Sequence, residues 1–134
     1  MTNRTSISTY RVYYEDTDAG GIVYYANYLK FAERARTEML RERNINQSDL
    51  IKSDQLAFVV RHVEMDLLKP AKLDDLLEIH TEITRISGAT LYMAQHIKHA
   101  GNTLVIVKVT LVTVHLTTMR PLRIPEFLKE ALSH

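Results

Sequence analysis

A change of sequence pattern between residues 13 and 28 constrains the fold of this chain more than any other feature. Residues 6–14 are rich in Thr, Tyr and Val, which is typical of a β-strand. From residue 27 to residue 43 the apolar side chains recur at helical spacing, so this segment predicts an amphipathic helix. A glycine pair, Gly20-Gly21, supplies the turn between the two elements. The chain therefore passes almost directly from a strand into a helix, and the connection lies at the helix N-terminus.

Four strand-like runs follow the helix, at residues 61–67, 76–86, 90–99 and 103–116. In the first run, apolar and polar residues alternate from Val63 onward, as in a half-buried strand. Short turns at 87–88 and 100–102 join the last three runs, which predicts an antiparallel meander. Residues 103–114 are apolar on both faces over much of their length, so we expect a central strand that is covered on both sides. With a short helix expected near residues 48–50, these elements define an α+β fold.

Composition restricts the classes of function open to this chain. Its 134 residues predict a single domain, 1–134. Its 17 basic and 16 acidic side chains give a net charge of +1, too weak a field for a dedicated nucleic-acid-binding protein. The absence of cysteine excludes disulfides, zinc–thiolate sites and a cysteine nucleophile, and it permits a reducing cytoplasm. The polar first ten residues predict no signal peptide, and the lack of a long apolar run predicts no integral membrane segment.

Three carboxylates, Glu15, Asp16 and Asp18, stand just before the predicted helix. A helix N-terminus presents unpaired backbone N–H groups and the positive end of the helix dipole, so a carbonyl oxygen placed there would be polarised. A carboxylate beside these donors can drive attack on that carbonyl. Two other interpretations fit the residues alone, because acids at such positions also form turns or cap helices, or bind a metal. A metal site is disfavoured, since no third ligand and no downstream glutamate follow at the spacing of a calcium loop.

The segment 16–24, Asp-Thr-Asp-Ala-Gly-Gly-Ile-Val-Tyr, resembles the motif of hotdog-fold acyl-CoA thioesterases of the 4-hydroxybenzoyl-CoA thioesterase type, and within them the YbgC branch associated with the Tol-Pal system. The resemblance continues through residues 27–29 and 35–38 and, more weakly, through 69–77 and nearly to the C-terminus, so it covers almost the whole chain. It implies one long central helix wrapped by a curved antiparallel sheet of about five strands. It also implies a homodimer with active sites at the subunit interface, and often a homotetramer of two dimers. The two apolar faces of residues 103–114 indicate the same association, because one helix covers only one face.

The resemblance assigns catalytic roles to two residues. Asp18 aligns with the essential aspartate of the family, whereas Asp16 is expected to be structural. The backbone N–H of Tyr25 is implied as the donor to the oxyanion, a role that does not depend on the side chain. In the Tol-Pal-associated relatives a histidine often stands at the position of Tyr25, so a role of that imidazole does not carry over to this chain.

The resemblance also implies a set of substrate-binding residues, namely Gly21, Val23, Tyr24, Asn27, Tyr28, Lys69, Arg85, Ser87 and Thr90. Tyr24 and Tyr28 are expected as walls of the pocket. Asn27 is expected to cap the helix rather than to orient the acyl group. Residues 85–90 match the turn at which family members contact CoA, and Arg85 suits phosphate oxygens, although an ordinary hairpin turn explains the same residues.

We therefore predict a cytoplasmic enzyme, or one at the periphery of the inner membrane, that hydrolyses an acyl-CoA or acyl-carrier-protein thioester to free acid and thiol. No metal or redox cofactor is implied, because CoA is part of the substrate. Whether Asp18 acts as general base or as nucleophile stays open. A hotdog dehydratase is disfavoured, since it would carry an Asp/His pair near its helix and no histidine precedes His62. The remaining alternative is a non-catalytic acyl-CoA-binding protein or a scaffold of envelope machinery.

Overall fold

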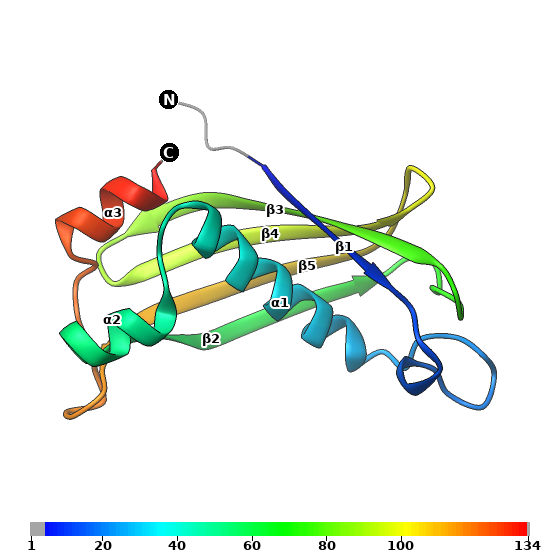
Figure 1. Cartoon of the computed structure of the whole chain (residues 1–134), viewed down its shortest axis with the longest axis horizontal. Coiled ribbons are helices and arrows are strands. Elements are labelled where there is room, and N and C mark those ends of the chain that lie inside the picture. The colour runs from blue at the N-terminus through cyan, green and yellow to red at the C-terminus, as the bar shows by residue number, and fades with distance from the viewer. Residues whose placement is uncertain (1–4, 134) are drawn as a thin grey trace.

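The computed structural model describes residues 5–133, which form one curved antiparallel sheet with a long helix on its concave side (Figure 1). The elements in chain order are β1 (Ser6–Arg11), the 3-10 turn η1 (Tyr14–Asp16), α1 (Asn27–Glu42), α2 (Gln47–Asp54), β2 (Leu56–Leu67), β3 (Leu76–Ser87), β4 (Thr90–His99), β5 (Asn102–His115), β6 (Arg120–Pro121) and α3 (Glu126–Leu132). The ends of the expected domain, residues 1–4 and 134, lie outside the described part of the chain.

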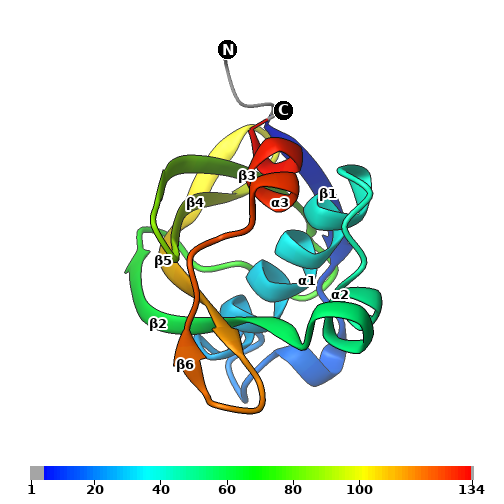
Figure 2. The same ribbon diagram turned by 90° about the vertical axis from the view of Figure 1, so that its left-hand side faces the viewer.

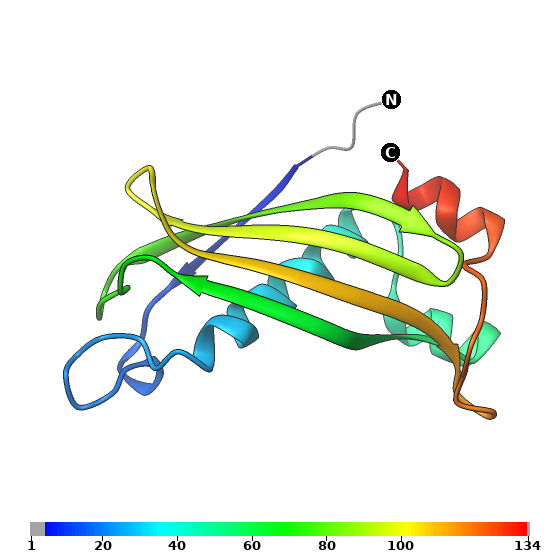
Figure 3. The same cartoon turned by 180° about the vertical axis from the view of Figure 1, so that it is seen from behind.

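The strands are ordered β1-β3-β4-β5-β2, and β6 pairs with the end of β5. β3, β4 and β5 are consecutive antiparallel neighbours, so the predicted meander is confirmed (Figure 3). β2 pairs antiparallel with β5 from Leu56 to Leu67, and it is therefore a 12-residue edge strand. It begins five residues before the predicted start at residue 61. A bulge between Val60 and His62 interrupts its register with β5.

Helix α1 buries the predicted apolar stripe, which comprises Tyr28, Phe31, Ala32, Ala35, Met39 and Leu40. The stripe packs against inward-facing side chains of the sheet, among them the fully buried Leu77, Ile79 and Val107. Burial of a side chain of this size stabilises the fold by about 1.5–3 kcal/mol. A long helix held against the concave side of a curled antiparallel sheet is the hotdog arrangement, so the predicted fold is confirmed (Figure 2).

A polar contact fixes α1 in the middle of this apolar core. The fully buried Gln95 of β4 donates from Nε2 to the Ala32 carbonyl of α1 at 2.8 Å and to Thr81 Oγ1 at 3.0 Å. The Arg36 guanidinium donates to Gln95 Oε1 at 3.0 Å, and burial lowers the pKa of Arg36. Both ends of the Gln95 amide are thus hydrogen-bonded, so the contact orients the helix without leaving an unpaired buried group.

The outward face of β5 is only partly covered in the single chain. β5 lies between β4 and β2, which confirms its central position. However, Lys108 is exposed, and Ile106 and Thr110 are only half-buried. The outward face at residues 106–110 is therefore uncovered within the single chain, because α1 packs on one side of the sheet only, and cover from a second copy stays a prediction.

Strand β2 also has apolar side chains that no other element of the described chain covers. Val60, Val63 and Leu67 pair with inward-facing residues of β5 and so point to the same side of the sheet as α1. They remain 47%, 40% and 54% exposed. The reason is that α1 packs mainly against β1, β3 and β5. The half-buried strand expected at 61–67 is thus largely exposed on both faces in the single chain.

The C-terminal helix closes the end of the core that is remote from the start of α1. Leu128 and Leu132 of α3 are buried in one cluster with Met39. The sequence pattern does not predict α3, since a seven-residue helix repeats its apolar spacing only once. Among residues 5–133, no helix is long and apolar enough to cross a membrane.

Candidate active site

Asp16 holds the loop between β1 and α1 together. Its Oδ2 accepts the Tyr13 N–H at 2.8 Å. Its carbonyl oxygen accepts the Tyr24 N–H at 3.0 Å and the Asn27 Nδ2–H at 2.9 Å. Asp16 thus ties the loop to the first residue of α1, which agrees with the structural role expected of it.

Asp18 occupies the tight turn that follows. Its Oδ1 accepts the Gly20 N–H at 2.8 Å, and its carbonyl oxygen accepts the Gly21 N–H at 3.0 Å. Gly21 has a φ of +77°, a conformation that favours glycine. Among residues 5–133, no further hydrogen bond or ion pair reaches the exposed Asp18 carboxylate. The turn-forming role is therefore observed, but it engages only one of the two carboxylate oxygens.

The start of α1 presents unbonded amides. The first turn is closed by Asn27 N–H to the Tyr24 carbonyl at 2.8 Å and by Tyr28 N–H to the Tyr25 carbonyl at 3.2 Å. Within the described chain, the N–H groups of Tyr25 and Ala26 have no acceptor. The predicted cap is wrong, because Asn27 is the first helical residue and its side chain reaches back to Asp16, while the N-cap position holds Ala26. Two donors at the positive end of the helix are left for a ligand.

These groups border an open pocket of about 470 Å³, lined by Asp18, Ile22, Val23, Tyr24, Tyr25, Tyr28, Leu67, Leu68, Lys69 and Pro70. The Tyr28 hydroxyl accepts the Ala71 N–H at 3.0 Å, and burial raises the pKa of Tyr28. The pocket gathers Asp18, Val23, three tyrosines and Lys69 from the predicted set. It also includes Leu67 and Leu68, which sequence reasoning missed although this apolar pair directly precedes the Lys69-Pro70 segment.

Tyr24 and Tyr25 form a pair at this pocket. Their ring centroids are 4.9 Å apart and the ring planes are inclined by 46°. A side-chain hydrogen bond to Tyr25 is the main cause that raises the pKa of Tyr24. Both rings are about half exposed. Each ring therefore lies against the other while keeping surface that a ligand can reach.

The predicted CoA turn lies at the other end of the sheet. Residues 71–73 contact the Asp18 loop and precede β3, whereas Ser87 ends that strand. Twelve strand residues span roughly 35 Å at about 3.3 Å per residue. The Arg85 guanidinium lies 5.4 Å from the Tyr92 ring centroid, and the Gly88 carbonyl accepts the Ile124 N–H at 3.0 Å. A single chain therefore does not bring Arg85, Ser87 and Thr90 to Asp18.

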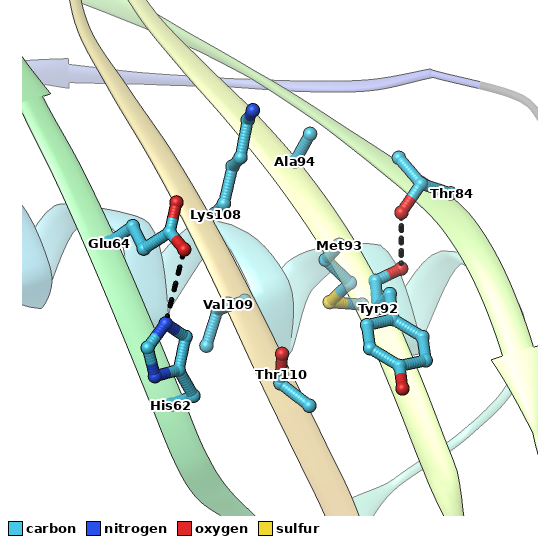
Figure 4. Close-up of a pocket in the computed structure, with 9 residues that line it drawn as sticks. All are labelled: His62, Glu64, Thr84, Tyr92, Met93, Ala94, Lys108, Val109 and Thr110. Carbon is cyan, nitrogen blue, oxygen red and sulfur yellow. Dashed lines mark hydrogen bonds and ion pairs between the residues drawn. The ribbon is translucent and has the colours of Figure 1, made fainter.

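A second hollow, of about 420 Å³, lies on the outward face of the sheet (Figure 4). Its lining includes Lys108, Tyr92 and the hydrogen-bonded pair of His62 Nε2 and Glu64 Oε1, 3.2 Å apart. Its charges are of both signs, and it contains none of the predicted site residues. Among residues 5–133, no group of three or more His, Asp or Glu side chains is arranged to hold a metal ion.

Comparison with known proteins agrees with this geometry. Residues 20–106 match the model of the family described as the thioesterase superfamily. The acyl-CoA thioesterase YbgC of Haemophilus influenzae is 48% identical over 126 residues, covering 92% of this chain and 91% of that protein. The acyl-CoA thioester hydrolase YbgC of Escherichia coli O6:H1 is 50% identical over 117 residues, or 87% of each. The crystal structure of a probable thioesterase from Bartonella henselae has a TM-score of 0.86 and 40% identity, covering 91% of this chain and 100% of that chain.

The chain belongs to the thioesterase superfamily, and its enzymatic class is thioester hydrolase. Within the superfamily it is similar to YbgC proteins over nearly all of its length, which confirms the resemblance indicated by the motif at 16–24.

Proposed function

We propose that this enzyme hydrolyses acyl-CoA thioesters at the pocket that contains Asp18. The observation that carries the proposal is a carboxylate with one unengaged oxygen at an apolar pocket, beside two unbonded amides of a helix start. An apolar pocket suits an acyl group, and the amides suit the negative charge that develops on a thioester carbonyl. The names of the YbgC relatives, which describe acyl-CoA thioesterases, support the same substrate class.

In the proposed reaction the thioester carbonyl oxygen accepts the Tyr25 N–H. Asp18 then acts in one of two ways. As a general base it takes a proton from water, the hydroxide attacks the carbonyl carbon, and the proton passes to the departing thiolate. As a nucleophile it bonds the carbonyl carbon and expels the thiolate, and water then hydrolyses the mixed anhydride. Both routes use only protein groups and water, with CoA as part of the substrate.

We propose further that each site is built from two chains. β2 is an edge strand, and its apolar side chains Val60, Val63 and Leu67 are exposed in the single chain. Two such edges related by a two-fold axis pair antiparallel, so the start of one β2 lies beside the end of the other. In such a dimer, residues 85–90 of one chain would lie at the same end of the assembly as Asp18 of the other chain. Arg85, Ser87 and Thr90 would then hold CoA phosphates from across the dimer, with Lys69 at the pocket itself.

The same pocket suits an acyl-carrier-protein thioester, because both carriers present the acyl group on a pantetheine thiol. Tetramers would arise from two such dimers. We propose action in the cytoplasm or at the periphery of the inner membrane, as the resemblance to Tol-Pal-associated relatives implies. Fractionation of cells that express the tagged chain from its own promoter distinguishes these locations.

A panel of acyl-CoA and acyl-carrier-protein thioesters, read by thiol release, tests the proposal. We expect hydrolysis of at least one acyl-CoA with saturation kinetics. Binding of acyl-CoA without thiol release across the panel would contradict the proposal and favour a non-catalytic binding protein.

A further inference from the structure

We propose that Tyr24 and Tyr25 are specificity-determining residues, and that their rings favour flat, aromatic acyl groups over saturated acyl groups of the same size. This inference rests on the proposed function, since it names the substrate class of the same pocket. It concerns the side chains of the two tyrosines, whereas the proposed oxyanion role concerns only a backbone N–H.

The two rings are available to a ligand. Both line the Asp18 pocket, and 49% of Tyr24 and 54% of Tyr25 are exposed. Tyr28 lines the same pocket but is only 3% exposed, and its hydroxyl is engaged by the Ala71 N–H. Tyr28 therefore belongs to the scaffold, while Tyr24 and Tyr25 retain ring surface for an acyl group.

The geometry of the Tyr24–Tyr25 pair is the reason to expect a preference for aromatic over saturated acyl groups. With centroids 4.9 Å apart and planes inclined by 46°, the rings present two surfaces at a fixed angle. An aromatic acyl group in contact with the pair can stack on one ring and meet the other edge to face, which are the arrangements that aromatic quadrupoles favour. A saturated ring fills the same space without that electrostatic match.

The other walls do not make this distinction. Leu67, Leu68 and Pro70 are aliphatic and lie on the segment that ends β2. They bury apolar surface of any acyl group in proportion to its area. Selectivity between an aromatic and a saturated ring of equal size therefore depends on the tyrosines.

The test compares benzoyl-CoA with cyclohexanecarbonyl-CoA, two thioesters of similar size that differ in aromaticity. For each enzyme the readout is the ratio of the two kcat/KM values, so intrinsic reactivity and the fraction of folded enzyme cancel between variants. We expect Tyr24→Leu and Tyr25→Leu each to lower the ratio by about 2- to 10-fold. Tyr24→Phe should stay within about twofold of the unsubstituted enzyme, because the ring is retained.

Tyr14→Leu is the matched control, since Tyr14 is 83% exposed and lies outside the pocket. An unchanged ratio in both leucine variants, alongside hydrolysis that depends on Asp18, overturns this inference and leaves the proposed function intact. Absence of hydrolysis of any acyl-CoA, or hydrolysis that persists in Asp18→Asn, overturns both.

Discussion

The two ends of the sheet carry different parts of the proposed site. At one end, the Asp18 loop, the start of α1 and the last residues of β2 enclose an apolar pocket with unbonded donors. At the other end, β3 carries the exposed Arg85 just before the strand ends at Ser87, and Arg85 contributes nothing to that pocket. In the proposed function the first end would react with the thioester, and the second would hold the phosphates of CoA. Their separation along β3 teaches that one chain contains both halves of the proposed site but cannot join them.

The largest effect should come from the reactive end. Asp18→Asn should lower kcat by at least about 10²- to 10⁴-fold, because an amide neither accepts a proton at neutral pH nor attacks a carbonyl. The bond from Gly20 N–H can persist with the asparagine Oδ1, so the melting temperature and the oligomeric mass should stay nearly unchanged. Steady-state kinetics beside thermal melting provide the measurement. Near-normal turnover, or a loss that merely follows unfolding, would reduce Asp18 to a turn residue.

Dimerisation, which completes each proposed site, should depend on β2. Val63→Lys places a charge among the exposed apolar side chains of β2, and burial of that charge between subunits costs several kcal/mol. We expect light scattering to give the 15.5 kDa monomer, with activity lowered by at least about tenfold because each site loses its second half. The control is Thr84→Lys on the outward face. Retention of the assembly and of activity in Val63→Lys would show that β2 is not the interface.

The anion-binding end should affect affinity rather than turnover. Arg85→Ala should raise KM by about tenfold with kcat nearly retained, since a contact with CoA phosphates is made equally in ground and transition states. Lys52→Ala removes an exposed cation from α2 and should leave KM unchanged. A KM that does not change for several acyl-CoAs in Arg85→Ala would remove this turn from the site.

The smallest effect should come from the other acid of the loop. Asp16→Asn weakens the bond from the Tyr13 N–H and should cost at most about 1 kcal/mol of folding stability. That loss corresponds to about 3–5 °C in the melting temperature for a domain of this size. Its kcat should remain within about threefold of the original, because Asp16 does not line the pocket that contains Asp18. A loss of turnover as large as that of Asp18→Asn would contradict the separation of roles between the two acids.

The sequence predicts correctly those features of the fold that depend on interactions between residues close together in the chain. The stripe on α1, the meander of β3, β4 and β5, and the glycine turn after Asp18 each depend on residues close together in the chain. The gathering of Asp18 with Tyr24, Tyr25 and Tyr28 is likewise a consequence of one loop and one helix start. These parts were accessible because hydrophobic periodicity and turn chemistry act over a few residues.

Contacts between segments far apart in the chain could not be predicted from these local patterns. The pairing of β2 with β5 joins strands separated in the chain by β3 and β4, and it helps to bring Leu67 and Leu68 to the pocket. The remote position of Arg85 follows from the direction of β3, which the motif at 85–90 does not encode. Asn27 was assigned to the cap because its residue type favours that position, but a tertiary bond to the Asp16 carbonyl takes its side chain instead.

Subunit complementation tests most directly the claim that two chains build each site. Asp18→Asn and Arg85→Ala chains, carrying different tags, are co-expressed and the mixed dimers are compared with each parent and with the double variant. If Asp18 and Arg85 act in one site from different chains, each mixed dimer has one intact site of two, and a random mixture recovers about a quarter of the original kcat/KM. Activity no higher than the average of the two parents would show that the residues act within one chain or not together, and would contradict this account.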